Sequence, residues 1–128
     1  MNVWTSRLFY LAAAYDGILG CAFLFFPIAV FAWQDVTPPN HVGYVQFPAA
    51  LLVVFAIMFI SIARDPMHNR GLIPYGILLK ISYCSITVWH WIFGGIPVMW
   101  KPFVIFDAVF ALFFFLVYRS LRAERTDG

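Results

Sequence analysis

The chain has very little charge for its length. Only 11% of its 128 residues are Asp, Glu, Lys or Arg, whereas 63% are hydrophobic. A water-soluble domain usually carries about a quarter of charged residues, because its surface has to be solvated. The composition therefore excludes an ordinary soluble domain and indicates an integral membrane protein. The length leaves room for a single domain.

Cysteine is scarce, and recognisable chemical motifs are lacking. Cys21 and Cys84 both lie inside hydrophobic runs, with neither a disulfide framework nor the spacing of a metal site. The sequence also has no nucleotide-binding loop, no cofactor motif and no nucleophile with a matching base. Apart from Lys80, the basic residues lie near the ends of hydrophobic runs and form no patch for nucleic acid. No catalytic residue, metal ligand or cofactor is therefore identified.

Four hydrophobic runs are present, each about as long as the roughly 20 helical residues that cross a bilayer. Pro27 lacks a backbone N–H and is expected to end or kink the first helix, leaving Pro27–Trp33 as an interfacial turn. The first run carries Asp16 and has no clear cleavage site, so we expect a membrane helix rather than a signal peptide. The sequence predicts an all-α fold, a four-transmembrane-helix bundle, with helices at about residues 8–26, 46–63, 72–93 and 102–118.

The distribution of basic residues predicts the orientation. When four helices are threaded through the membrane, every arginine falls on one side, and Lys101 alone falls on the other. Cytoplasmic loops and termini carry the excess of lysine and arginine in membrane proteins. Both termini are therefore expected in the cytoplasm. The arginines are Arg7, Arg64, Arg70, Arg119, Arg122 and Arg125.

The third hydrophobic run carries a set of polar side chains. Lys80, Tyr83, Thr87 and His90 are spaced three, four and three residues apart, so they share one face of a helix. A lysine within such a run costs about 2.5–3.5 kcal/mol on insertion and needs a partner or water. We therefore expect the remainder of the protein to cover this polar stripe.

Asp16 is the expected partner of Lys80. Asp16 follows Arg7 by nine residues and Lys80 follows Leu72 by eight, which places both charges about 12–13 Å along parallel helices. An ion pair would shelter both charges in the interior. The pair is interpreted either as a structural clasp between helices or as a functional group, such as a proton relay or the counter-charge of a substrate.

A second set of polar residues is expected nearer the outer surface. His41 belongs to the first outer loop, Gln46 begins the second run, and Asp107 lies five residues into the fourth. With His90 these side chains could converge on a shallow outward-facing site. Two histidines and a carboxylate can bind a transition metal. Because the spacing matches no metal motif, hydrogen bonding at the interface is the preferred interpretation.

Four segments that together cover most of the chain carry a resemblance: RLFYLAAAYDGILG, PPNHVGYVQFPAALLVVF, ARDPMHNRGLIPYGILLKISY and GGIPVMWKPFVIFD. With these segments the chain resembles a family of small, uncharacterised bacterial membrane proteins. In layout the chain is also similar to DoxX-like four-helix proteins, some of which serve as subunits of quinone-linked oxidoreductases. The resemblance implies a four-helix fold in the bacterial cytoplasmic (inner) membrane. It implies no activity, so no catalytic residue is carried over.

Three functions remain open at this point. The first is a non-catalytic accessory or scaffolding subunit, self-associated or part of a larger membrane assembly. The second is a binder or redox partner of a lipophilic small molecule such as a quinone, because the polar stripe lies among apolar residues as in ligand pockets. The third is a proton-coupled or ion transporter, although the long discontinuous helices common in transporters are not predicted.

Overall fold

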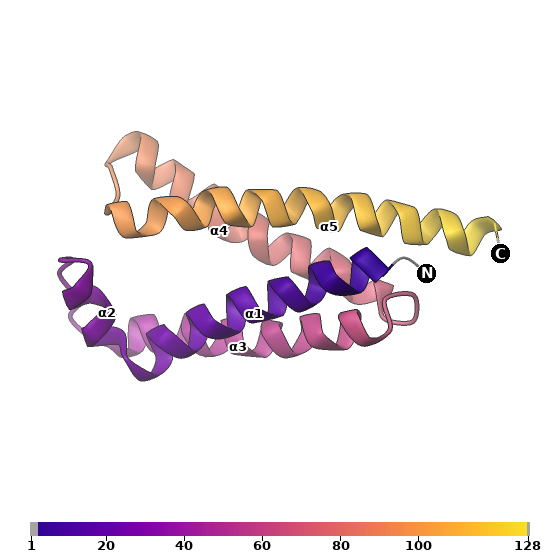
Figure 1. The fold of residues 1–128 in the computed structure, drawn as a ribbon. Coiled ribbons are helices and arrows are strands. Elements are labelled where there is room, and N and C mark those ends of the chain that lie inside the picture. The colour runs from indigo at the N-terminus through magenta and orange to yellow at the C-terminus, as the bar shows by residue number, and fades with distance from the viewer. Residues whose placement is uncertain (1–2, 128) are drawn as a thin grey trace. The chain divides into compact units, whose positions relative to one another are not determined.

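The computed structural model describes the main chain of residues 3–127 and the side chains of residues 3–124. Within this range the chain is helical and contains no β-strand (Figure 1). Four helical segments are long and apolar enough to cross a membrane, which confirms the predicted fold class. The elements are α1 (Val3–Phe25), α2 (Pro27–Trp33), α3 (Gly43–Arg64), the 3₁₀ turn η1 (Arg70–Leu72), α4 (Ile73–Phe93), the 3₁₀ turn η2 (Val98–Trp100) and α5 (Lys101–Asp127).

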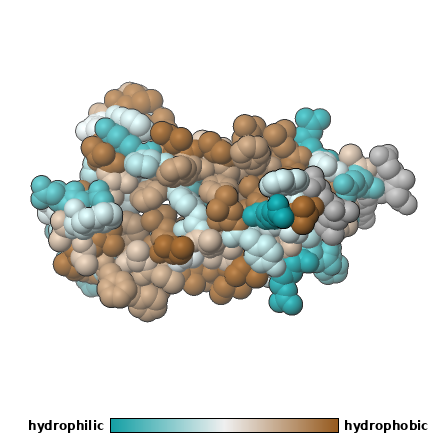
Figure 2. Space-filling view, viewed as in Figure 1, coloured by the Kyte–Doolittle hydropathy of each residue, from teal (hydrophilic) through white to brown (hydrophobic). Residues whose placement is uncertain are grey.

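The chain divides after Arg64 into two compact units, and the expectation of a single membrane domain stays a prediction. The first unit is a hairpin of α1 and α3 joined through α2, and the second is a hairpin of α4 and α5. Hydrophobic side chains cover most of the face seen in Figure 2. Exposed apolar surface of this extent is expected where lipid rather than water surrounds the protein.

Small residues bring α1 and α3 together. Ala49 and Ala56 are buried and lie seven residues apart on α3, so they face α1 along one side. Gly20 on α1 lies so close that a Cβ atom there would be 2.8 Å from the carbonyl oxygen of Ala49. Gly17 lies opposite Ala56, where a Cβ atom would have a normal contact of 3.5 Å. Such close approach is how membrane helices gain packing energy without a hydrophobic driving force.

Pro27 ends α1, as the sequence predicted, and opens the short helix α2. Where a helix is interrupted, its last carbonyl groups lack the N–H donors that a further turn would supply. The side chain of Gln46 on α3 supplies a donor, since its Nε2 lies 3.1 Å from the carbonyl oxygen of Leu24. The rings of Phe23 and Phe31 meet edge to face, with centroids 6.1 Å apart, so α2 folds back onto α1. The expected interfacial turn is thus a short helix.

The helix ends differ from the prediction most at α5. The sequence placed this end near Tyr118, but α5 continues to Asp127. The prediction was wrong because hydropathy marks where the apolar run ends, not where the helix ends. The last turns are rich in arginine, leucine, alanine and glutamate, which are good helix formers. Cation–π contacts from Arg119 to Phe115 and from Arg122 to Tyr118 also link successive turns.

Candidate functional site: an ion pair within the α4–α5 hairpin

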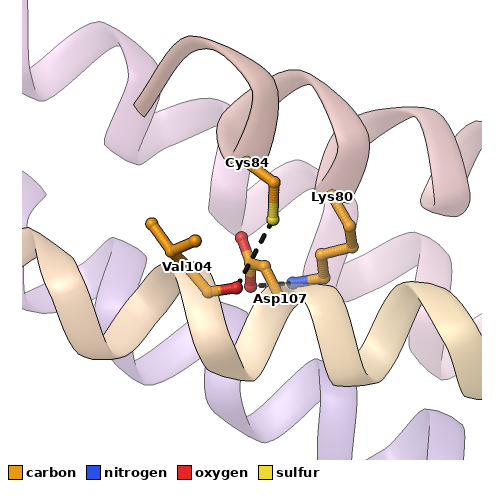
Figure 3. A network of polar contacts seen from close by, with 4 residues as sticks. All are labelled: Lys80, Cys84, Val104 and Asp107. Atoms are coloured by element: carbon orange, nitrogen blue, oxygen red, sulfur yellow. Dashed lines mark hydrogen bonds and ion pairs between the residues drawn. The ribbon is translucent and has the colours of Figure 1, made fainter. Parts of the chain in front are cut away.

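Lys80 and Asp107 form an ion pair inside the second hairpin. The Lys80 Nζ lies 3.1 Å from the Asp107 Oδ1, and the two side chains are 1% and 11% exposed (Figure 3). Lys80 comes from the middle of α4 and Asp107 from the second turn of α5. At this distance the contact is a charge-assisted hydrogen bond, the stronger class of hydrogen bond in proteins.

An aromatic ring covers the Lys80 ammonium. Its Nζ lies 5.2 Å from the centroid of the Phe110 ring, within the range of a cation–π contact. Phe110 in turn packs on Phe114 one turn later, with centroids 5.8 Å apart. Both phenylalanines are buried, so the ammonium lies between a carboxylate and an apolar wall. This surrounding favours a compensated charge over a hydrated one.

Two more polar side chains of α4 reach main-chain carbonyls across the hairpin. The Cys84 thiol donates to the carbonyl oxygen of Val104 over 3.5 Å, directly beside the ion pair (Figure 3). The Tyr83 hydroxyl donates to the carbonyl oxygen of Trp100 over 2.9 Å. A carbonyl oxygen has two lone pairs, so it can accept such a bond in addition to its helical one. Lys80, Tyr83 and Cys84 therefore all bind the chain segment 100–107.

The predicted polar stripe is buried at one end and open at the other. Lys80 is buried, Tyr83 and Thr87 are half-buried, and His90 is exposed. The carbonyl oxygen of His90 accepts the N–H of Gly94 over 2.9 Å and so closes the end of α4. Among the described residues, Lys80 is therefore covered as expected, Tyr83 and Thr87 are partly covered, and His90 is not covered.

The structure gives Lys80 a partner that sequence reasoning assigned elsewhere. Asp107 was expected in the outer-side cluster, but its carboxylate binds Lys80. Residue counts along a predicted helix give main-chain depth only, and they do not include the reach of a lysine side chain. Asp16 is buried and belongs to the other unit, so its pairing with Lys80 stays a prediction.

The other two members of the predicted outer-side cluster have local partners in the first unit. The Nδ1 of His41 accepts the N–H of Gly43 over 3.0 Å, and Gln46 binds Leu24 as described above. His41 and Tyr44 lie beside an open hollow of about 510 Å³ that Phe47 and Pro48 also line. The convergence of His41 and Gln46 with Asp107 stays a prediction. Within either unit, no three described His, Cys, Asp or Glu side chains lie together as metal ligands.

The α4–α5 site is suited to holding two helices together. Its charges compensate each other, and its hydroxyl and thiol groups bind main-chain oxygens of the opposite segment. Removing one partner of a buried pair typically costs about 3–5 kcal/mol, because the remaining charge is stranded. The carboxylate and the ammonium of the same pair also lie within proton-transfer distance of each other, so a proton could pass between them.

Comparison with known proteins adds no further constraint. No family model matches the chain, and neither a curated protein nor a solved structure shows significant similarity to it. A functional proposal therefore depends on the geometry of the α4–α5 hairpin and on its surface.

Proposed function

We propose that the protein is a non-catalytic accessory or scaffolding subunit of a membrane assembly. It spans a bacterial cytoplasmic membrane four times, with both termini in the cytoplasm. The orientation is supported by the arginines near the ends of the predicted runs, because cytoplasmic segments carry the excess of basic residues. A periplasm-sensitive reporter should be inactive when fused after Gly128 and active when inserted next to Asn40, and the reverse result would overturn the orientation.

The observation that carries this proposal is that the polar side chains of α4 bind residues of the segment 100–107. Lys80 binds Asp107, Tyr83 binds the carbonyl oxygen of Trp100, and Cys84 binds that of Val104. The contacts to Asp107 and Val104 join α4 to α5, and the contact to Trp100 joins α4 to the turn η2 just before α5. Buried polar groups that bind one another rigidify a scaffold and fix its register. A clasp of this kind supports a structural role.

The outer surface of the same hairpin supports association with lipid or with other membrane helices. Large apolar side chains on α4 and α5 are exposed. At the start of α5, the Nζ of Lys101 lies 5.1 Å from the centroid of the Trp91 ring on α4. Without a hydrophobic driving force in lipid, helices associate through packing and a few hydrogen bonds. Partner helices would therefore contact these exposed side chains: Leu78, Ile81, Ile86, Ile105 and Val109.

Purification from the native host in a mild detergent tests the proposal. The protein should elute with stoichiometric partner chains or as an oligomer, and crosslinkers applied to intact membranes should trap the same species. The test variant is Ile86→Ala, which changes an exposed residue of α4 and should weaken association without changing the melting temperature. A chain that elutes alone and uncrosslinked from native membranes would overturn the accessory role.

A second candidate is the binding of a lipophilic small molecule such as a quinone. The specific observation in its favour is the open end of the polar stripe, where Tyr83 and Thr87 are half-buried and His90 is exposed. Hydroxyl and imidazole groups beside an apolar wall are the usual anchors for a carbonyl-bearing ligand. Mass spectrometry of the organic extract should then find a stoichiometric species that is not a phospholipid. Its absence from protein purified in several mild detergents would remove this candidate.

A further inference from the structure

One face of α5 changes from apolar to basic along its length. Leu112, Phe115, Leu116, Arg119 and Arg122 follow one another at intervals of three, one, three and three residues, so they share one side of the helix. We call this set the α5 surface stripe. Leu112, Phe115 and Leu116 are 57%, 47% and 50% exposed, and both arginines are exposed as well.

Burial on the other side of α5 fixes the direction of this stripe. Phe110, Phe114 and Leu121 are buried and are spaced four and seven residues apart, so they share a different face of the helix. Since Leu121 lies between Arg119 and Arg122 in sequence and is 2% exposed, the basic part of α5 is ordered as helix and is held against the protein. The two arginines are therefore presented from a defined surface and not from a free tail.

Ring contacts orient the two guanidinium groups. The Arg119 Cζ lies 5.9 Å from the centroid of the Phe115 ring, and the Arg122 Cζ lies 5.8 Å from that of Tyr118. A guanidinium group that lies over a ring still presents N–H donors along its edge, and its planar fork matches the oxygens of a phosphate. Two such forks one helical turn apart form a recognition site for an anionic headgroup.

The apolar part of the stripe is long enough to contact the acyl chain of a lipid. From Leu112 to Arg119 the helix rises about 10 Å, at 1.5 Å per residue. The exposed apolar side chains of that stretch can line the first part of an acyl chain whose headgroup lies at the arginines. We infer that the α5 surface stripe binds one anionic phospholipid, with its phosphate at Arg119 and Arg122 and an acyl chain along Leu112, Phe115 and Leu116.

Other basic residues at helix ends lack this arrangement. Arg7 lies 4.9 Å from the ring centroid of Trp4, and Lys101 lies 5.1 Å from that of Trp91, each as a single cation over a ring. Only α5 among the described helices has two exposed arginines one turn apart beyond exposed apolar residues of the same face. Two guanidinium groups can donate more hydrogen bonds to a phosphate than one can, so α5 is the preferred position for a bound headgroup.

Native mass spectrometry of the protein in mild detergent tests this inference, with phosphatidylglycerol and phosphatidylcholine added in equal amounts. One phosphatidylglycerol per chain should remain bound, in preference to phosphatidylcholine. Arg119→Gln with Arg122→Gln should lower the fraction bound at limiting lipid at least tenfold, because each arginine near an anionic lipid contributes about fivefold to affinity. Either single substitution should give about a fivefold loss.

The matched control is Arg7→Gln with Arg64→Gln, which removes the same charge from two different helices. It should change the bound fraction less than about twofold. An equal loss in this control, or equal retention of the two lipids by the unaltered protein, would overturn the inference. Displacement of the lipid by an equal concentration of glycerol phosphate would overturn it too, because the site would then recognise a free phosphate. Circular dichroism melts verify folding, and the single variants serve if the double variant melts early.

Discussion

The Lys80 ammonium and the Asp107 carboxylate lie 3.1 Å apart inside a hairpin whose helices are otherwise dominated by apolar residues. The two residues are separated by 27 positions, so the contact joins two consecutive hydrophobic runs across a short loop. Both charges are expensive in lipid when alone, and the pair removes most of that cost.

Removal of one partner should destabilise the protein more than removal of both. Asp107→Asn alone leaves the Lys80 ammonium beside the buried Phe110, and Lys80→Met alone leaves a buried carboxylate. Either substitution should cost about 3–5 kcal/mol. The double substitution should be close to neutral, because no charge remains to be desolvated. Thermal unfolding in detergent measures all three variants as a double-mutant cycle. Losses that simply add would mean that the two side chains do not interact.

Asp16 provides a second cycle, which addresses the pairing predicted from sequence. Asp16 is buried at 1% exposure, so its carboxylate also requires compensation. If Asp16 and Lys80 interact, Asp16→Asn with Lys80→Met should be milder than the sum of the single substitutions. The same thermal unfolding measurement applies, with Asp107→Asn as the reference partner. An Asp16–Lys80 coupling below about 0.5 kcal/mol would reject the pairing of these two residues.

A methyl group at Gly20 should push α1 and α3 apart. The added Cβ would lie 2.8 Å from the carbonyl oxygen of Ala49, and main-chain atoms cannot move away cheaply. Gly20→Ala should therefore destabilise the first hairpin by about 1–3 kcal/mol, the usual cost of overpacking. Gly71→Ala is the matched control, because a Cβ there meets nothing within 4 Å. Equal melting temperatures for Gly20→Ala and the unaltered protein would show that the helices are not in this close contact.

Gln46 should stabilise the interruption of α1. Its Nε2 donates to the Leu24 carbonyl just before the break at Pro27. Gln46→Met keeps the length of the side chain but removes the donor, and it should cost about 1–3 kcal/mol if the carbonyl is left unsatisfied. Gln34→Met is the control, because Gln34 is exposed. A larger loss for the control variant in thermal unfolding would contradict the role of Gln46.

Composition and proline positions were sufficient to predict the four long helices, although not all of their ends. Low charge and four apolar runs predicted an all-α membrane fold, and Pro27 correctly marked the end of α1. The continuation of α5 to Asp127 was missed because it depends on helix propensity and arginine–ring contacts, which hydropathy does not report.

The partner of Lys80 was harder to predict than the helices. Sequence spacing correctly placed Lys80 and Tyr83 on one face of α4, but it assigned Asp107 to another cluster. A depth count gives the level of each Cα atom and ignores side-chain reach. The sequence did contain a signal for this pair, because Lys80 and Asp107 are single charges in two consecutive hydrophobic runs. Antiparallel neighbours joined by a short loop pack together most readily. The contact of Cys84 with a main-chain carbonyl had no sequence signal.

The same ion pair has a consequence for biosynthesis. While α4 emerges from the ribosome, its lysine has no carboxylate from α5, and a single lysine at the centre of a segment opposes insertion by about 2.5–3.5 kcal/mol. Asp107 follows only 27 residues later, so the two segments can leave the translocon together as a hairpin. In a glycosylation-mapping assay, residues 70–95 alone should therefore insert less efficiently than residues 70–124. Lys80→Leu should remove the difference, and equal insertion of both unaltered segments would argue against joint release.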